Sequence, residues 1–227
     1  MDESTDRIPE GSMVDRMSLI SPPIETTGSA SGARTAVPKI RLGVMASGSG
    51  SNFEAIAQAI ADGSLWAEIA LVIYNNPNAG VVERAERWKV PTVLLNHRDY
   101  ESREALDAAI VASLQAASVD WVIMAGWMRI VTPVLIESFP ERILNIHPSL
   151  LPSFKGGKAI EQAFHSGVKI TGCTVHYVVP EVDSGKILIQ AAVPILPNDE
   201  LADLQHRIQV QEHRIYPRAI AIAAQLN

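Results

Sequence analysis

Short apolar segments alternate with segments of helical periodicity along most of the chain, and this alternation restricts the possible folds more than any other feature. After the apolar run 40–46, Phe53, Ile56 and Ile60 follow at helical spacing. The alternation continues, and we predict strands at 69–74, 92–95, 121–125 and 142–145 and helices at 79–88 and 101–117. Right-handed crossovers between such strands imply a Rossmann-like α/β fold, in which helices flank a mostly parallel sheet.

The pattern changes in the last third of the chain. A helix is predicted at 160–166, followed by two β-branched runs at 172–179 and 186–193. A short turn-rich segment separates these runs, which is typical of an antiparallel pair, here at one edge of the sheet. A final helix is expected from about 199 to 225, kinked at Pro217. No internal repeat or linker interrupts 39–227, so we predict one domain there.

Residues 1–38 differ in composition from the rest of the chain. Of these 38 residues, 17 are Ser, Thr, Gly or Pro and none is aromatic. A segment of this kind buries too little apolar surface to offset its ordering entropy. We therefore expect a flexible, disordered tail over 1–38.

Composition limits the classes of function. The chain has 227 residues, of which 47% are hydrophobic and 19% are charged, and its net charge is −6. This acidic balance argues against a nucleic-acid-binding surface. A single cysteine, Cys173, excludes an intrachain disulfide and favours a reducing compartment. No apolar run is long enough to cross a membrane, and the acidic start of the chain is unlike a targeting peptide, so we predict a cytoplasmic location.

A glycine-rich turn, Gly48-Ser49-Gly50-Ser51-Asn52, joins the first predicted strand to the first helix. Backbone N–H groups at such a helix start can bind a phosphate. The Gly-Lys-Ser/Thr ending of a nucleotide-binding P-loop is missing. Phe53 stands where a dinucleotide-binding turn needs a small residue, and no acid follows the second strand. A phosphate monoester is the ligand that remains. The alternative, at equal odds, is that the turn binds no phosphate and needs glycine only for its backbone angles.

The segment Asn145-Ile146-His147-Pro148 ends a predicted strand, and ligands of open α/β sheets bind at the carboxyl ends of strands. Asn145 and His147 lie two residues apart and so share one face. Together an amide and an imidazole can stabilise an oxyanion and move a proton to a departing nitrogen. A histidine bonded only to backbone is the alternative. A nearby carboxylate would support such an imidazole, but Asp183, in Val-Asp-Ser-Gly, is by sequence alone more simply a turn residue.

Several segments in this order resemble the glycinamide ribonucleotide formyltransferase family of purine synthesis, from about residue 40 to 219. The matching segments are the glycine-rich turn 48–52 and residues 124–130, 145–152, 172–177 and 211–217. The resemblance implies an enzyme that transfers a formyl group from 10-formyltetrahydrofolate to the amine of 5-phosphoribosylglycinamide, without a metal.

The resemblance also implies roles for individual residues. Catalysis would depend on Asn145, His147 and Asp183. The phosphoribosyl substrate would be bound by Gly50, Ser51, Asn52 and Glu212. The folate side would comprise Arg103, Met128, Arg129, Ile130, Val131 and Asn145, with Val178, Val179 and Pro180 as the opposite wall.

The chain departs from the family pattern at two lysines. Lys158 stands where many relatives have a histidine-rich helix start, and Lys186 stands where proline is common. We expect small-molecule substrates, neither nucleic acid nor membrane as partner, and a monomer or homodimer.

Alternative functions remain open at this point. A formyltetrahydrofolate hydrolase would use similar catalytic residues, but it usually carries a regulatory domain and lacks the Gly-Ser-Asn turn. A methionyl-tRNA formyltransferase would need an added C-terminal domain and a basic surface. A non-catalytic folate- or nucleotide-binding α/β module would keep the glycine-rich turn and the pocket without needing the catalytic side chains.

Overall fold

The computed structural model describes residues 19–23 and 38–226, and its strands form one sheet in the order β1-β8-β7-β6-β5-β2-β3-β4. Neighbouring strands from β6 to β4 are parallel, whereas the β6–β7, β7–β8 and β8–β1 pairs are antiparallel. The strands are β1 (Leu19–Ser21), β2 (Ile40–Ala46), β3 (Ala67–Tyr74), β4 (Thr92–Leu94), β5 (Trp121–Met124), β6 (Ile143–His147), β7 (Ile170–Tyr177) and β8 (Ile187–Pro194). This arrangement confirms the predicted fold class, including the antiparallel strands at one side of the sheet.

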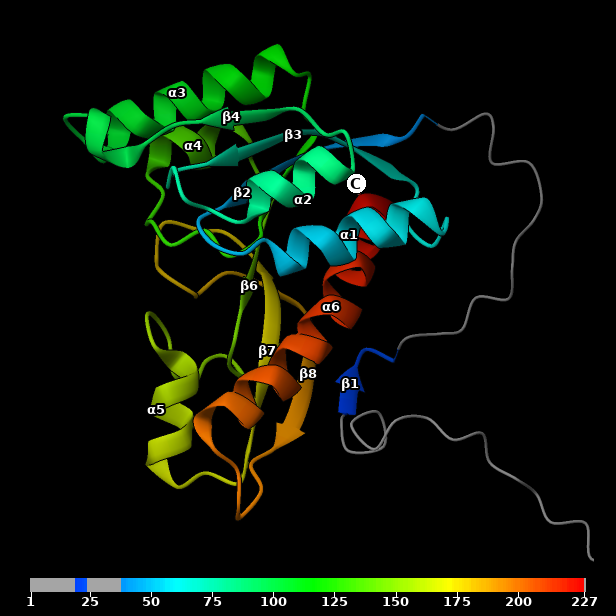
Figure 1. Ribbon diagram of the computed structural model, residues 1–227, viewed down its shortest axis with the longest axis vertical. Helices are drawn as coiled ribbons and strands as arrows, with labels where there is room; N and C mark the ends of the chain where they lie inside the picture. Colours follow the sequence, from blue (N-terminus) through cyan, green and yellow to red (C-terminus); the bar gives the residue numbers. More distant parts are fainter. Residues whose placement is uncertain (1–18, 24–37, 227) are drawn as a thin grey trace, which may run out of the picture.

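Helices cover both faces of the sheet (Figure 1). On one face α1 (Ser51–Ala61), α2 (Val81–Arg87) and α6 (Leu201–Leu226) bury their apolar sides, and α5 (Ala159–Ser166) packs at the edge of the same core. On the other face α3 (Arg103–Ala116) and α4 (Pro133–Ser138) close a second core. Both faces of the parallel strands are therefore buried, as the fully apolar run of β5 predicts.

The order of the strands places a crevice between β2 and β5. The chain leaves β2 toward β3 and β4 on one side, then returns to β5 on the other side of β2. Connections after β2 and β5 diverge at such a point and leave room for a ligand at the carboxyl ends. The glycine-rich turn follows β2, and the segment 125–131 follows β5, so both border this crevice.

The predicted tail differs from the structure at one place. Leu19, Ile20 and Ser21 form β1 and pair antiparallel with Ala192, Ala191 and Gln190 of β8. The edge of a sheet has unpaired backbone N–H and C=O groups, to which an added strand can form hydrogen bonds. The composition of a segment does not reveal this pairing. The rest of 1–38, apart from residues 22, 23 and 38, lies outside the described residues.

Besides β1, two short helices are absent from the sequence predictions. These are α4 and the single-turn 3₁₀ helix η2 (His97–Asp99), both too short for a periodic pattern to stand out. The final helix α6 runs without interruption through Pro217. In the part of the chain that the structure describes, no helix is long and apolar enough to span a membrane.

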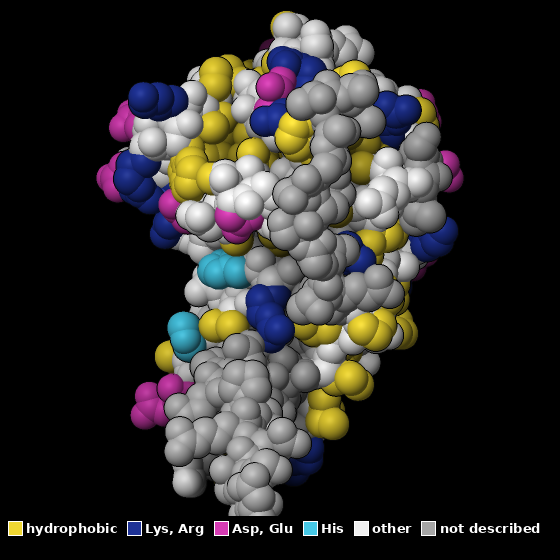
Figure 2. Space-filling model, turned by 90° about the vertical axis from the view of Figure 1, so that its right-hand side faces the viewer, with side chains coloured by type: hydrophobic (Ala, Val, Ile, Leu, Met, Phe, Trp, Pro, Cys, Tyr) yellow, Lys and Arg dark blue, Asp and Glu magenta, His cyan; other side chains and the backbone are white. Residues whose placement is uncertain are grey.

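Charged side chains of both signs lie close to one another on the surface. On the face shown in Figure 2, Lys and Arg side chains are interspersed with Asp and Glu side chains over the upper part of the molecule. Between α1 and α2, Glu54 forms ion pairs with Arg84 and Arg87, all of them partly exposed. Ion pairs near the surface contribute little to stability individually.

Candidate active site

Strand β6 presents Asn145 and His147 on one face of the sheet. Leu144 and Ile146 alternate with them and are buried in the core under α6. Because side chains alternate along a strand, burial of these two residues fixes the direction of Asn145 and His147. The shared face predicted from the spacing is confirmed.

The Asp183 carboxylate lies beside the His147 ring. Asp183 Oδ2 is 3.3 Å from His147 Nδ1, and both side chains are more than nine-tenths buried. The Gly156 N–H donates to the same carboxylate at 2.8 Å. Asp183 has a positive φ of 50°, a conformation that Asp tolerates better than most residues. The turn between β7 and β8 thus brings a carboxylate to the end of β6, a contact that the sequence could not establish.

Both nitrogens of the His147 ring have partners. Nδ1 faces Asp183, and Nε2 lies 2.8 Å from the carbonyl oxygen of Phe154. A carbonyl oxygen only accepts, so Nε2 must carry a proton in this arrangement. A substrate oxygen that is to receive a hydrogen bond from Nε2 has to replace the Phe154 carbonyl.

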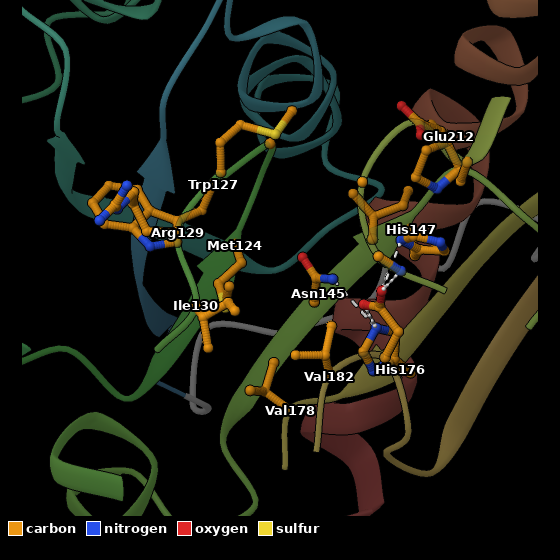
Figure 3. A pocket seen from close by; sticks show the side chains of 18 of the residues that line it. Met124, Trp127, Arg129, Ile130, Asn145, His147, His176, Val178, Val182 and Glu212 are labelled. Atoms are coloured by element: carbon orange, nitrogen blue, oxygen red, sulfur yellow. Dashed lines mark hydrogen bonds and ion pairs between the residues drawn. The ribbon is translucent and has the colours of Figure 1, made fainter. Parts of the chain in front are cut away.

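His176, on β7, completes the polar cluster. Its Nδ1 is 2.8 Å from the Tyr177 carbonyl oxygen, and its Nε2 is 3.3 Å from Asn145 Nδ2. The same Nε2 also lies 3.5 Å from Asp183 Oδ1. A neutral ring with its proton on Nδ1 can accept one N–H of the Asn145 amide at Nε2, whereas a protonated ring donates from Nε2 to Asp183. In either state the Asn145 amide has a second N–H that is available to the cavity. Figure 3 shows these side chains and their contacts converging at the end of β6.

The pKa of Asp183 is lowered from its ordinary value. Burial by itself raises this pKa, but hydrogen bonds from His176 and the Gly156 N–H, together with the charges of His147 and His176, outweigh the burial. Asp183 therefore stays a carboxylate over the neutral range and can stabilise a positive charge on the adjacent imidazole.

The glycine-rich turn is shaped by its backbone. Gly50 precedes α1 with φ 76° and ψ 26°, a left-handed conformation that favours glycine. A Cβ placed on Gly50 would lie 2.7 Å from Val81 Cβ of α2. The first N–H groups of α1, which starts at Ser51, have no acceptor within the helix and carry the positive end of its dipole. The turn thus has the geometry of an anion site.

Asn52 links this turn to α6. Its Nδ2 donates to Glu212 Oε2 at 2.9 Å, whereas its Oδ1 is buried and without a hydrogen-bond partner. Burial raises the pKa of Glu212 to about 7, and the Asn52 hydrogen bond opposes this only in part. Glu212 can therefore accept or donate hydrogen bonds near neutral pH.

One cavity of about 470 Å³ joins these groups. Its walls include the polar cluster of Asn145, His147, His176 and Asp183, together with Asn52 and Glu212. They also include four of the predicted folate-side residues, which are Met128, Arg129, Ile130 and Val131. Val178, Val179 and Pro180 form the opposite wall, as predicted, and Lys158 also lines the cavity. In Figure 3, Asn145 lies between the apolar side chains of Met124, Ile130, Val178 and Val182 and the polar group of His147, His176 and Glu212.

Three predicted residues do not line this cavity. Gly50 and Ser51 form the start of α1, and Ser51 Oγ accepts a hydrogen bond from Gln209, which does line the cavity. Arg103, at the start of α3, lines a separate small cavity of about 210 Å³ that also contains Arg129. Arg129 thus borders both spaces.

Sequence reasoning missed two cavity residues with a clear signal. Gln205 and Gln209 precede Glu212 by seven and three positions, so the helical period of α6 places them on its cavity face. For His176 the sequence leaves a place in the pocket and a place in an apolar strand equally open, and the structure shows it in the cavity wall, directly opposite Asn145 in the β6–β7 register. No metal-binding cluster of three or more His, Cys, Asp or Glu side chains occurs within 19–23 and 38–226.

This chain is similar to known proteins over most of its length. A family model described as formyl transferase matches residues 40–220. The chain belongs to the formyl transferase family. The phosphoribosylglycinamide formyltransferase of Bacillus subtilis is 40% identical over 187 residues, which are 82% of this chain and 96% of that protein. The human trifunctional purine biosynthetic protein adenosine-3 is 42% identical over 186 residues, and this chain spans only 18% of its length.

Solved structures of the formyl transferase family have the same fold. Glycinamide ribonucleotide transformylase 1 from Symbiobacterium toebii is 47% identical, with a TM-score of 0.81 over 85% of this chain and 91% of that one. Phosphoribosylglycinamide formyltransferase from Bacillus halodurans is 46% identical, with a TM-score of 0.78 over 79% of this chain and 93% of that one. The architecture of this formyl transferase is thus shared with enzymes whose names specify the same two substrate groups, a formyl and a phosphoribosylglycinamide.

Proposed function

We propose that this formyl transferase moves a formyl group from 10-formyltetrahydrofolate to the amine of 5-phosphoribosylglycinamide, in purine biosynthesis in the cytoplasm. The observation that carries the proposal is the Asn145–His147–Asp183 cluster, with 3.3 Å between His147 Nδ1 and Asp183 Oδ2, in a cavity that also reaches the glycine-rich turn. A phosphate site and an acyl-transfer site in one cavity suit a phosphorylated amine acceptor. The enzymes from Bacillus subtilis and Bacillus halodurans carry that acceptor in their names.

The phosphoribosyl end of the acceptor would bind at α1. The N–H groups after Gly50, at Ser51 and Asn52, would receive the phosphate at the helix N-terminus. Glu212 lies farther along the cavity wall and would bind ribose hydroxyl groups. Asn52 Oδ1, buried and unpartnered, is placed to accept one further hydrogen bond from this ligand.

The transfer itself needs one bond to form and one to break. The acceptor amine attacks the formyl carbon, and the bond between that carbon and the donor nitrogen then breaks. During the attack the formyl oxygen becomes an oxyanion, which the free N–H of Asn145 would stabilise. His147 Nε2 would exchange the Phe154 carbonyl for this oxygen and then supply a proton to the departing nitrogen.

Asp183 would support both roles of His147. Its carboxylate faces Nδ1 and stabilises the protonated ring. The attacking amine must also lose a proton, which the His147–Asp183 pair can accept. The low pKa of Asp183 means that this support is present over the whole neutral range. No covalent intermediate is required, because the amine reacts directly with the formyl carbon.

The formyl donor would occupy the apolar half of the cavity. Met128 and Ile130 are exposed there at 80% and 53%, and Val178 and Val182 lie opposite. Exposed apolar side chains in a concave site suit a flat, largely apolar ligand. The carboxylate end of a folate would reach Arg129 and, in the adjoining cavity, Arg103.

The deciding experiment measures formyl transfer from 10-formyltetrahydrofolate to 5-phosphoribosylglycinamide by wild type and Asp183→Asn. We expect ribonucleotide-dependent turnover in wild type and a loss of roughly 10²–10⁴-fold in kcat for the variant, the range of general acid–base support. Folate turnover at a rate that does not depend on added ribonucleotide would identify a hydrolase. Tight binding of both compounds without turnover would identify a non-catalytic module.

A further inference from the structure

The hydroxyl group of Thr174 is the centre of a buried polar network beside the candidate active site. Thr174 is 0% exposed, and its Oγ1 donates to the Ser149 carbonyl oxygen at 2.7 Å. The same oxygen accepts from the Leu151 N–H at 3.1 Å and from Gln190 Nε2 at 2.9 Å. Gln190 Nε2 also contacts the Leu151 carbonyl oxygen at 3.1 Å. One hydroxyl group therefore uses its donor and both acceptor positions inside the protein.

The strand register explains why the network lies at this place. His147 of β6 stands opposite Thr174 of β7, which stands opposite Gln190 of β8. Residues directly opposite one another share a face of the sheet, so Thr174 and Gln190 lie on the same face as His147. The segment that follows β6 turns back over this face, where its backbone groups would otherwise be buried without partners.

The anchored segment leads to the two backbone groups that hold the catalytic cluster. After Leu151 the chain reaches Phe154, whose carbonyl oxygen contacts His147 Nε2 at 2.8 Å. Two residues later, the Gly156 N–H donates to Asp183 at 2.8 Å. Within the segment, Ser149 Oγ donates to the Ser153 carbonyl oxygen at 2.6 Å and shortens the free length of chain. Thr174 thus acts on His147 and Asp183 through a short, internally bonded loop.

We propose that Thr174 is a positioning residue that fixes the ring orientation and the protonated nitrogen of His147 through the Phe154 carbonyl. The inference rests on the proposed function, because it assumes that the His147 ring takes part in the transfer. Before the substrate binds, the carbonyl requires a proton on Nε2, the nitrogen that would donate to the formyl oxygen once this oxygen replaces the carbonyl. The Asp183 carboxylate at Nδ1 is an acceptor as well. Without the anchor the carbonyl moves, and a neutral ring keeps its single proton on Nδ1, toward Asp183, and leaves Nε2 without one.

The test compares Thr174→Val with Thr174→Ser. Valine keeps the shape but removes the hydroxyl group, whereas serine keeps all three hydrogen bonds. We expect kcat to fall by roughly 10²-fold in Thr174→Val, as for a misplaced catalytic group, with KM for both substrates nearly unchanged. Thr174→Ser should restore most of the activity.

Thr171→Val is the matched control. Thr171 precedes Thr174 on β7, is 1% exposed, and its Oγ1 has no hydrogen-bond partner in the described structure. It is three positions away on a strand, so its side chain points to the opposite face. This variant should keep the wild-type kcat, and it separates loss of a buried threonine from loss of the anchor.

The direct readout is the ¹⁵N spectrum of the His147 ring in the full chain, assigned with a His147→Asn variant. Wild type and Thr174→Ser should give the same ring signals, and Thr174→Val should give shifted ones. Unchanged ring signals in folded Thr174→Val overturn the inference, whatever its activity. Shifted signals with unchanged kcat support the positioning role and instead contradict the proposed role of His147 in the transfer.

A second variant covers the case in which Thr174→Val does not fold. Gln190→Met removes two hydrogen bonds of the network and leaves the Thr174 hydroxyl group bonded to Ser149 and Leu151. The expected change in ring signals has the same direction but is smaller, with a loss of less than about tenfold in kcat, because the Thr174 hydroxyl group loses only one of its three hydrogen bonds. A folded Gln190→Met protein with wild-type ring signals then overturns the inference.

Discussion

The end of β6 and the turn after β2 face one cavity, but they are held in place by different means. At β6, side chains fix one another: Asp183 contacts His147 and His176, and His176 contacts Asn145. At the turn, backbone geometry dominates, because Gly50 adopts a left-handed conformation packed against Val81. Function at the end of β6 should therefore depend on the chemistry of individual side chains, whereas function at the turn should depend on the shape of the backbone.

Among the further variants that test this comparison, removal of the Asn145 amide should have the largest effect. Asn145→Ala removes the proposed donor to the formyl oxygen, so kcat should fall by roughly 10²–10³-fold, about 3–4 kcal/mol of transition-state stabilisation. KM for the ribonucleotide should change little, because the proposed phosphate site lies at the glycine-rich turn. Steady-state kinetics with both substrates tests this. A large rise in KM with unchanged kcat would mean that Asn145 binds substrate and does not stabilise the transition state.

The Glu212 carboxyl group should make stability depend on pH. Its pKa is raised to about 7 in the folded protein, so the folded state binds a proton that the unfolded state releases above its ordinary value of 4.5. Stability from this group is therefore fully present below that value and is lost as pH rises toward 7, by at most about 3 kcal/mol. Denaturant unfolding of wild type and Glu212→Gln between pH 5 and 8 measures the effect. Equal slopes for both proteins would show that Glu212 has no raised pKa.

A methyl group at Gly50 should disturb the turn. Gly50→Ala forces a left-handed alanine against Val81, which should cost roughly 1–3 kcal/mol of stability and raise KM for the ribonucleotide while kcat changes less. Gly63→Ala is the control, because Gly63 also has a positive φ of 81° but nothing lies within 4 Å of an added Cβ. The idea that backbone shape controls phosphate binding fails if the two variants have the same KM.

The smallest effect is expected for Gln209. Its Nε2 donates to Ser51 Oγ at 2.9 Å, and Gln209→Met removes this bond while keeping the length of the side chain. One neutral hydrogen bond contributes about 1 kcal/mol, so KM for the ribonucleotide should rise less than tenfold. Steady-state kinetics measures this change in KM, and isothermal titration calorimetry with the ribonucleotide measures the accompanying change in Kd. If kcat falls instead and KM does not change, Gln209 acts in the transfer step, as proposed for the β6 side chains, and not in binding at the turn.

Sequence and structure agree where local pattern decides. The strands that flank the site and the long helices follow from apolar periodicity, and the shared face of Asn145 and His147 follows from their spacing on one strand. The short helix α4 has too few residues for a pattern, and β1 forms because β8 leaves an open edge. The separation of Arg103 from the main cavity likewise depends on how α3 packs against the sheet.

The alternation of the longer strands and helices, the face on which Asn145 and His147 lie, and the turn that opens α1 could all be predicted, because each depends on residues close together in the chain. The contacts of Asp183 and of the Phe154 carbonyl with His147, and of Asn52 with Glu212, are known only from the folded structure. These contacts join different elements, and their geometry is set by the packing of the whole sheet and its helices. A local pattern carries no information about such distances.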